Sequence, residues 1–118
     1  METINRPSST KSSEPAGIKH RLDEEALLIH QVLAGQQDRF QELLQPHMSV
    51  VLRTVQTKMR NSAEVDDVIQ ETLLKALTRL AQFRFEAGFR AWLVQIAINE
   101  SRQWYRRRRS IPEGATLA

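Results

Sequence analysis

Arginine and amide side chains that suit contact with nucleic acid are concentrated in the last third of the chain. From Arg79 to Arg109 the sequence holds eight Arg and no Lys, against Glu86 and Glu100. At about 100° per residue, one face of a helix over residues 89–109 would collect a strip of aromatic, amide and guanidinium groups. The strip consists of Trp92, Gln95, Asn99, Arg102, Gln103 and Arg106. Such groups can hydrogen-bond base edges and phosphates, and a ring can stack on a base.

A run of four cations, Arg106, Arg107, Arg108 and Arg109, surrounds the end of the same helix. Guanidinium groups placed there would hold phosphates without reading sequence. Alternatively, arginines near a helix C-terminus complement the helix dipole and stay solvated. The strip and the run together favour contact with nucleic acid.

Aromatic rings also gather in the segment that precedes this helix. It contributes three rings and two cations: Phe83, Phe85, Phe89, Arg84 and Arg90. Rings on a turn could accept an unstacked base, as in proteins that bind single strands, with the cations beside the backbone. Equally, Phe83 and Phe89 could pack between two helices and join them. Trp92 allows the same two interpretations, and buried packing is the favoured one for this residue. The spacing leaves these alternatives open.

A cluster of acids occupies a different segment. Residues 61–71 hold Glu64, Asp66, Asp67 and Glu71 and no base. Three of these carboxylates could share a divalent cation, but acids at a helix start also stabilise the helix dipole without a ligand, so we expect no metal. Leu74 falls outside the expected buried stripe. The exposed set Asp66, Asp67, Gln70, Glu71 and Leu74 would suit a basic protein partner.

Residues for catalysis are sparse. His20, His30 and His47 are scattered, and no Ser or carboxylate is spaced to form a relay with any of them. The chain has no Cys and no Gly-rich loop for phosphate. We therefore expect no enzyme, no catalytic residue and no cofactor, and we expect His47 to pack at a helix interface.

Helix breakers divide the chain into four expected helices. Between residues 18 and 111 the only Gly and Pro residues are Gly35, Pro46 and Gly88. The first helix is expected from Asp23 as N-cap to Gly35 as the stop. The others are expected over residues 38–59 with a break at Pro46, over residues 62–80 with a capping box from Asn61 to Glu64, and over residues 89–109. These ranges predict an all-α bundle.

Spacings of three and four residues predict which side of each helix is buried. For the first helix we expect Leu27, Leu28, Val32 and Leu33 in the core. The stripe of the third helix is Val65, Val68, Ile69, Leu73, Ala76, Leu77 and Leu80. The fourth helix contributes Phe89, Leu93, Ile96, Ala97 and Trp104. Glu100 lies on this core side, so we expect an arginine partner for it or a frayed, solvated position.

The length of 118 residues suits one domain, and the formal net charge is only +3. The Ser- and Pro-containing residues 1–20 predict a flexible tail without a signal peptide. Residues 110–118 have the composition of a linker. The longest apolar stretch, residues 91–98, falls short of the roughly 20 residues that span a bilayer, so we expect no membrane contact and a cytoplasmic protein.

The order of these features resembles region 2 of bacterial sigma factors, especially the extracytoplasmic-function (ECF) group. The resemblance rests on residues 66–76 (DDVIQETLLKA), 83–84 (FR), 89–93 (FRAWL) and 96–99 (IAIN), followed by the Arg run. It extends upstream through Gly35, Asp38, Phe40, Glu42 and Leu43. It implies a small helical domain over residues 21–109, followed by the start of a linker at residues 110–118 and without the region 4 domain.

The resemblance also implies a function and its residues. Asp66, Asp67, Gln70, Glu71 and Leu74 would bind the clamp helices of the RNA polymerase β′ subunit. Residues 84–88, Phe89, Arg90 and Trp92 would lie where the promoter −10 element melts, and Asn99 and Gln103 would face its bases. Arg102 and Arg106 to Arg109 would hold phosphates. The partners are then core polymerase and the non-template strand, with an anti-sigma factor as a further partner. A nucleic-acid-binding module without polymerase binding is the alternative.

Overall fold

The computed structural model describes the backbone of residues 15–110 and the side chains of residues 22–108. The chain divides into two compact units, Met1–Leu43 and Leu44–Ala118, and each is described by itself. Every regular element of the described backbone is a helix, which confirms the expected all-α class. Residues 1–14 of the expected tail and 111–118 of the expected linker lie outside the described residues.

The first unit contains α1 (Pro15–Leu33) and the 3-10 turn η2 (Gln37–Arg39), and α2 (Phe40–Leu44) begins in it. The expected start of the first helix at Asp23 is wrong, because α1 already begins at Pro15. Proline suits the first helical position, where its missing N–H would have had no partner. At the other end the expected stop is confirmed: Gly35 has a φ of 111°, and Gln36 N–H donates to Gln31 O at 3.0 Å. This is a Schellman motif.

The buried side of α1 differs from the expected one. Ile29 and Val32 are buried, whereas Leu27 and Leu33 are exposed. Residues three apart share a helix face, and Ile29 with Val32 define it here.

In η2 and α2 the Arg39 guanidinium donates to the Glu42 carboxylate at 2.5 Å. This hydrogen bond raises the pKa of Arg39.

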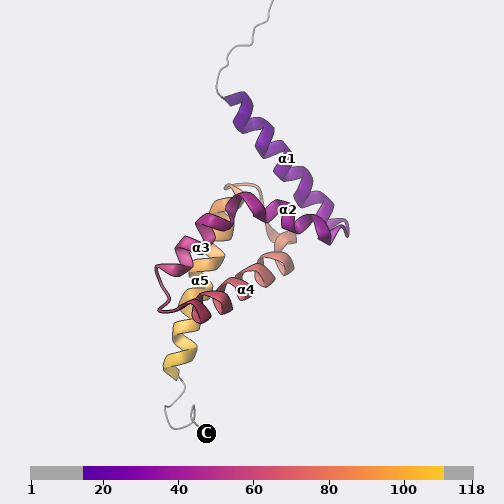
Figure 1. Ribbon diagram of the computed structural model, residues 1–118. Helices are drawn as coiled ribbons and strands as arrows, with labels where there is room; N and C mark the ends of the chain where they lie inside the picture. The colour runs from indigo at the N-terminus through magenta and orange to yellow at the C-terminus, as the bar shows by residue number, and fades with distance from the viewer. Residues whose placement is uncertain (1–14, 111–118) are drawn as a thin grey trace, which may run out of the picture. The chain divides into compact units, whose positions relative to one another are not determined.

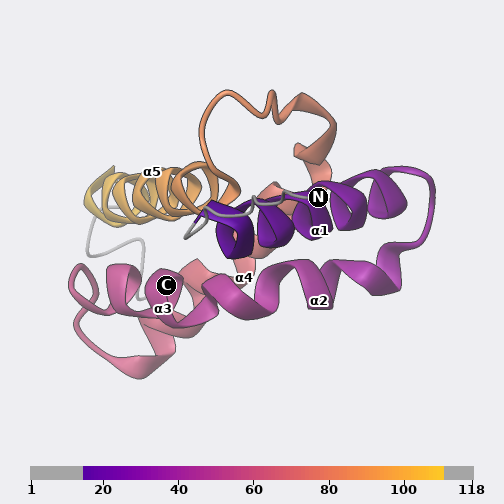
Figure 2. The same ribbon diagram turned by 90° about the horizontal axis from the view of Figure 1, so that it is seen from above.

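The second unit contains η3 (Gln45–His47), α3 (Met48–Gln56), α4 (Ser62–Thr78), η4 (Leu80–Gln82) and α5 (Phe89–Ser110). The break expected at Pro46 is confirmed, since η3 separates α2 from α3. Helix α5 packs against both α3 and α4, which also contact each other. Figure 1 shows α3 and α5 running in the same direction and α4 running in the opposite direction. Figure 2 shows the connection from α4 to α5 as a wide loop beside the three helices.

The core of this unit lies where α3, α4 and α5 meet. Its fully buried apolar side chains include Val51, Val55, Val68, Ala76, Leu93 and Ala97. Thr72 is also fully buried, although the expected stripe omitted it, because its Oγ1 donates to Val68 O at 2.7 Å. Leu73, Leu77 and Trp104 are only partly buried. The stripe of α4 is therefore centred on Val68, Thr72 and Ala76.

Candidate functional site

The start of α4 is fixed by two side-chain hydrogen bonds. Asn61 accepts from Glu64 N–H at 2.9 Å, as a capping residue should. The Glu64 carboxylate accepts from Arg60 N–H at 2.8 Å, one residue before the partner expected for a capping box. The Glu64 side chain is therefore buried, and its carboxylate is already hydrogen-bonded at the helix start. It does not lie on the exposed face of α4 that carries the other acids.

That exposed face holds all five residues predicted to bind a protein. We call Asp66, Asp67, Gln70, Glu71 and Leu74 the α4 patch; each of them is exposed. Leu74 is 55% exposed, which makes it one of the most exposed large apolar residues of the described chain. An apolar residue surrounded by carboxylates and an amide suits a partner with matching apolar and basic groups.

A second polar face lies on α5. Without Trp92, which is partly buried, the expected strip on this helix is what we call the α5 strip: Gln95, Asn99, Arg102, Gln103 and Arg106. Gln103 is partly buried and the other four residues are exposed. Gln95 Nε2 donates to Asn99 Oδ1 at 3.2 Å, so this bond fixes the orientation of the Asn99 amide and does not use Nδ2 as a donor. The strip therefore presents amide and guanidinium donors along about three turns of helix.

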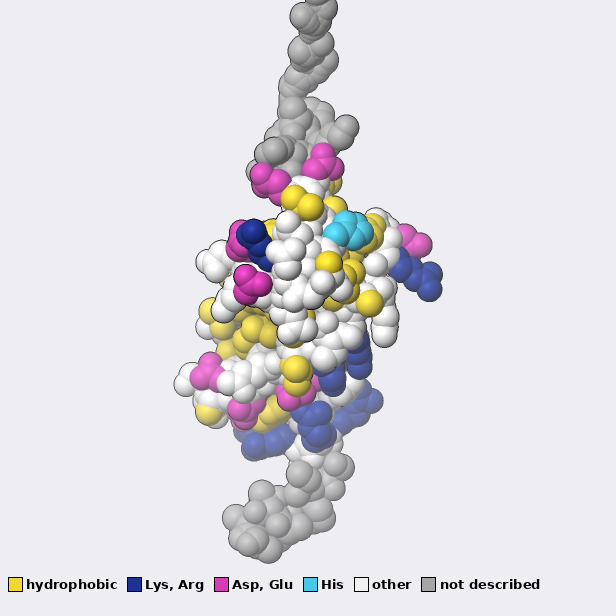
Figure 3. All heavy atoms as spheres, turned by 90° about the vertical axis from the view of Figure 1, so that its right-hand side faces the viewer, with side chains coloured by type: hydrophobic (Ala, Val, Ile, Leu, Met, Phe, Trp, Pro, Cys, Tyr) yellow, Lys and Arg dark blue, Asp and Glu magenta, His cyan; other side chains and the backbone are white. Residues whose placement is uncertain are grey.

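The arginine run continues the strip toward the end of α5. Arg106, Arg107 and Arg108 are exposed, whereas the side chain of Arg109 lies outside the described residues. The Arg108 guanidinium stacks over the Trp104 ring at 4.7 Å from its centroid. Figure 3 shows dark-blue Lys and Arg side chains gathering next to this end of the helix. Their positive charge is thus local, although the net charge of the chain is small.

The rings around the start of α5 form one cluster, and the structure separates their roles. Phe83 and Phe89 are buried and meet edge to face at 5.7 Å. Trp92 is partly buried and lies 5.3 Å from Phe83 and 5.5 Å from Phe89. The packing alternative therefore holds for Phe83 and Phe89. Because Phe89 is only 2% exposed, it does not present its ring to a base in this structure.

Phe85 differs from its neighbours. It is 48% exposed, and its ring lies 4.7 Å from Phe83. Its φ of 64° places a bulky residue in the left-handed region, where residues other than Gly, Asn and Asp are rare. Strain of this kind is concentrated at binding and switch sites. Arg84 beside it is also exposed.

Arg90 has a structural role that the sequence did not reveal. Its Nε donates to His47 Nδ1 at 3.1 Å, and its Nη2 donates to Pro46 O at 2.8 Å. His47 is buried and its ring lies 5.4 Å from Phe89, which confirms the expected packing of this histidine. Arg90 thus ties the start of α5 to η3.

Glu100 is paired inside the molecule. Its Oε2 accepts from Lys75 Nζ at 2.9 Å, and only 2% of its side chain is accessible. The expectation of an arginine partner or a frayed position is wrong: the partner is a lysine, and the position lies in the middle of α5. A lysine on α4 was the missed signal, since its long stem can reach a buried carboxylate from a half-exposed position.

Comparison with known proteins connects these surfaces to a family. The family model of sigma-70 region 2 matches residues 43–111. The chain belongs to the sigma-70 region 2 family. This membership confirms the resemblance seen in the sequence, and the matched range includes α3, α4 and α5 with their two polar faces.

Individual relatives of this region 2 chain are ECF sigma factors and similar proteins. RNA polymerase sigma factor CnrH of Cupriavidus metallidurans is 33% identical over 87 residues, which are 74% of this chain and 46% of CnrH. ECF RNA polymerase sigma factor SigM of Mycobacterium tuberculosis is 30% identical over 96 residues, or 81% of this chain and 48% of SigM. The chain spans about half the length of these relatives.

Two solved structures resemble the region 2 fold found here. An engineered region 2 of sigmaE in complex with GTAAAA has a TM-score of 0.62 and 30% identity, covering 69% of this chain and 84% of that one. CnrH in complex with the cytosolic domain of CnrY has a TM-score of 0.60 and 32% identity, covering 70% of this chain and 53% of that one.

Within residues 15–110, no helix is long and apolar enough to cross a membrane.

Proposed function

We propose that this chain acts in transcription initiation by binding core RNA polymerase through the α4 patch and the promoter −10 element through α5. The observation that carries the proposal is that two polar faces of opposite charge lie on two different helices of one core. A protein that only bound nucleic acid would need the basic face alone.

The α4 patch supports the polymerase contact. It combines an exposed leucine with three carboxylates and an amide. Apolar contact supplies affinity at the centre of such a surface, while charge complementarity selects the partner and speeds association. The curated relatives are named RNA polymerase sigma factors, which favours core polymerase as the partner. The β′ clamp helices are the part of polymerase that the family resemblance implies.

The α5 strip supports the promoter contact. Asn99 and Gln103 would meet base edges, and Arg102 with the arginine run would hold phosphates. The engineered region 2 of sigmaE was solved in complex with GTAAAA, which favours an oligonucleotide of this kind as the ligand here. Phe85 and the partly buried Trp92 supply rings for an unstacked base, with Arg84 beside them. The buried Phe89 packs against Trp92, with ring centroids 5.5 Å apart.

Promoter melting follows from differential binding and needs no catalytic residue. A surface that binds an unpaired strand better than a duplex shifts the equilibrium toward the open form by that difference. The opposing term is the unstacking of a base, about a few kcal/mol. The chain would therefore be an initiation factor rather than an enzyme, and it would work in the cytoplasm beside polymerase and promoter.

A capture experiment tests the proposal. Purified chain is immobilised and incubated with core RNA polymerase, and the double variant Asp67→Ala/Gln70→Ala is compared with Asp38→Ala/Gln41→Ala, a matched acid and amide outside α4. We expect the first pair to abolish capture and the second to preserve it, with affinity for a −10 oligonucleotide unchanged in both. No capture of polymerase by the unmodified chain, with oligonucleotide binding retained, would favour the alternative of a general nucleic-acid-binding module.

A further inference from the structure

Arg90 uses one edge of its guanidinium group to contact η3. Its Nε donates to His47 Nδ1 at 3.1 Å, and its Nη2 donates to Pro46 O at 2.8 Å. The donors of a guanidinium group form a rigid planar fork, so two bonds from one edge fix orientation as well as distance. An ammonium group has no such fork. The contact therefore depends on the shape of the arginine side chain and not only on its charge.

The histidine that accepts from Arg90 belongs to the ring cluster at the start of α5. The His47 ring lies 5.4 Å from Phe89, and the Phe89 ring lies 5.5 Å from Trp92. His47 and Phe89 are buried, whereas Trp92 is partly buried. Protein interiors are close-packed, so a displaced side chain also displaces its neighbours. A change at the bond between Arg90 and His47 therefore reaches Trp92 through one intervening ring.

Arg90 also lies where the chain returns from the exposed loop to the core. Residues 84–88 are all exposed, and Phe89 is the first buried residue after them. Trp92 N–H donates to Gly88 O at 3.1 Å, which forms the first turn of α5. Figure 2 shows the loop extending beside the helices before α5 begins. The burial of Phe89 and the bonds of Arg90 are thus the first contacts that fix this helix after the loop.

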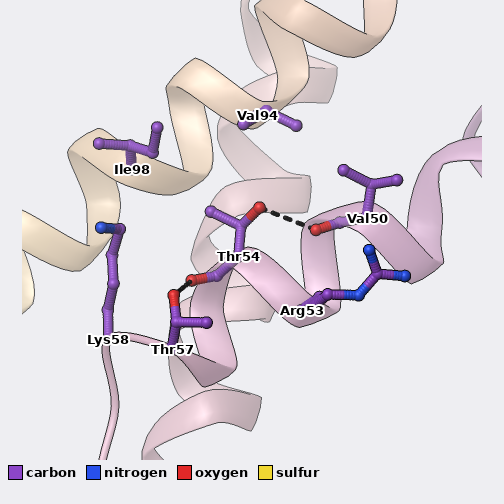
Figure 4. A pocket seen from close by; sticks show the side chains of 7 residues that line it. All are labelled: Val50, Arg53, Thr54, Thr57, Lys58, Val94 and Ile98. Carbon is purple, nitrogen blue, oxygen red and sulfur yellow. Dashed lines mark hydrogen bonds between the residues drawn. The ribbon is translucent and has the colours of Figure 1, made fainter.

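Farther along, α3 and α5 border a groove that side chains do not fill. It has a volume of about 290 Å³, and Val50, Val94 and Ile98 are part of its lining. Figure 4 shows Val94 and Ile98 of α5 across the groove from Val50 of α3. Beyond the groove the Tyr105 hydroxyl donates to Lys58 O. Because this side of the interface is open, this bond and the contact with η3 hold the two helices at their spacing.

We propose that Arg90 and His47 are positioning residues for strand binding: together they hold the start of α5 so that Trp92 can receive an unstacked base. Arg90 acts through Trp92 and makes no phosphate contact, although its residue type and place in the sequence suggest one. A ring already held in place binds a base at a lower cost in conformational entropy than a mobile one. This role rests on the proposed function, in which Trp92 meets the promoter strand.

Conservative substitutions separate positioning from phosphate binding. Arg90→Lys keeps the charge and loses the fork, whereas Arg90→Gln also removes the charge. We expect both variants to weaken binding of a labelled single-stranded GTAAAA oligonucleotide about fivefold or more, the effect of one lost hydrogen bond. The slope of log affinity against log salt should stay unchanged in both, because it counts phosphate contacts. The matched control Arg79→Lys, at an exposed arginine after α4, should bind the strand as the unmodified chain does.

A double-mutant cycle tests whether Arg90 and His47 act together. His47→Phe keeps an aromatic ring beside Phe89 and removes the Nδ1 acceptor, so it should weaken strand binding as Arg90→Lys does. The double variant should lose no more affinity than Arg90→Lys alone, because substitutions that remove the same interaction have non-additive effects. Circular dichroism and urea denaturation establish that each variant is folded under the binding conditions.

Trp92 fluorescence reports positioning in the absence of nucleic acid. The chain has two tryptophans, so Trp104→Phe leaves Trp92 as the only one. In this background we expect acrylamide to quench Trp92 more strongly in folded Arg90→Lys and His47→Phe than in the unmodified chain. Arg79→Lys should leave quenching unchanged. A residue that only contacted phosphate would not alter this signal, since no phosphate is present.

Three results would overturn the inference. Normal strand binding by Arg90→Lys, with a salt slope lowered by about 0.7 in Arg90→Gln, would make Arg90 a phosphate contact. Additive losses in the cycle would separate Arg90 from His47, and unchanged quenching would separate both residues from Trp92. Failure of the unmodified chain to bind the strand would instead refute the proposed promoter contact. Quenching would then still decide whether Arg90 and His47 position Trp92.

Discussion

Asn99 shows how one hydrogen bond can prepare a side chain for recognition. Gln95 donates to its Oδ1, so the orientation of the amide is set within the helix. The amide is exposed on α5, one turn before Gln103. A donor held in a fixed direction discriminates among the acceptor patterns of base edges better than a freely rotating one.

We predict that Asn99→Ala reduces discrimination among −10 sequences more than it reduces non-specific affinity. The expected loss is about 1–3 kcal/mol between matched and mismatched oligonucleotides. Equilibrium binding to the matched and the mismatched oligonucleotide measures this loss. The control is Gln82→Ala, which removes an exposed amide outside the α5 strip. Equal losses on all sequences would assign Asn99 to the scaffold.

Lys75 and Glu100 form the ion pair that joins the two functional helices. Glu100 is almost fully buried, and its Oε1 has no hydrogen-bond partner among the described residues. Removing the lysine would leave a buried carboxylate without its counter-charge, so we predict that Lys75→Met destabilises the fold by about 3 kcal/mol. Urea denaturation measures the change. The double variant Lys75→Met/Glu100→Leu should recover much of that loss, because it removes both charges; no recovery would mean that Lys75 acts through packing of its stem.

At the scale of elements, the loop at residues 83–88 presents one exposed ring on a strained backbone. Phe85→Asn keeps a residue that tolerates the left-handed region and removes the ring. We predict that the free energy of binding a single strand becomes less favourable by about 1–3 kcal/mol, which is the contribution of one base stacked on a ring. Phe85→Tyr is the matched control and should retain affinity, because its ring is preserved. If both variants bind as the unmodified chain does, Phe85 takes no part in stacking.

The end of α5 should contribute electrostatics without specificity. Replacing Arg106, Arg107, Arg108 and Arg109 by Ala removes four cations that could contact phosphates. We predict that the slope of log affinity against log salt falls by about two to three units, at roughly 0.7 per contact with a single strand. A salt titration measures it, and Arg60→Ala/Arg79→Ala should leave the slope unchanged. An unaltered slope in the four-fold variant would show that the run lies away from phosphate.

At the scale of the whole molecule, the fold places the two binding surfaces on different helices and fixes the positions of these helices against one core. The α4 patch faces outward from one helix and the α5 strip from another, while both helices bury their remaining sides in one core. The Lys75–Glu100 pair and the Arg90 contacts with η3 connect these elements by directional bonds. Substitutions on one surface should therefore leave binding at the other unchanged.

Much of this protein is determined by sequence patterns that act locally. Gly35, Pro46 and Asn61 end, break or cap helices through backbone geometry and nearby hydrogen bonds, so their effects can be predicted without knowing the fold. The family resemblance likewise follows from motifs read in order along the chain, and the exposed position of the α4 patch follows from helical periodicity.

Tertiary structure alone decided which partner each ambiguous side chain takes. Phe83 and Phe89 are buried while Phe85 is exposed, because the turn of the loop, and not the spacing of the three rings, determines which of them enter the core. Arg90 and Glu100 found His47 and Lys75 at sequence separations of 43 and 25 residues. Contacts over such distances depend on how α3, α4 and α5 pack, and no local period encodes them.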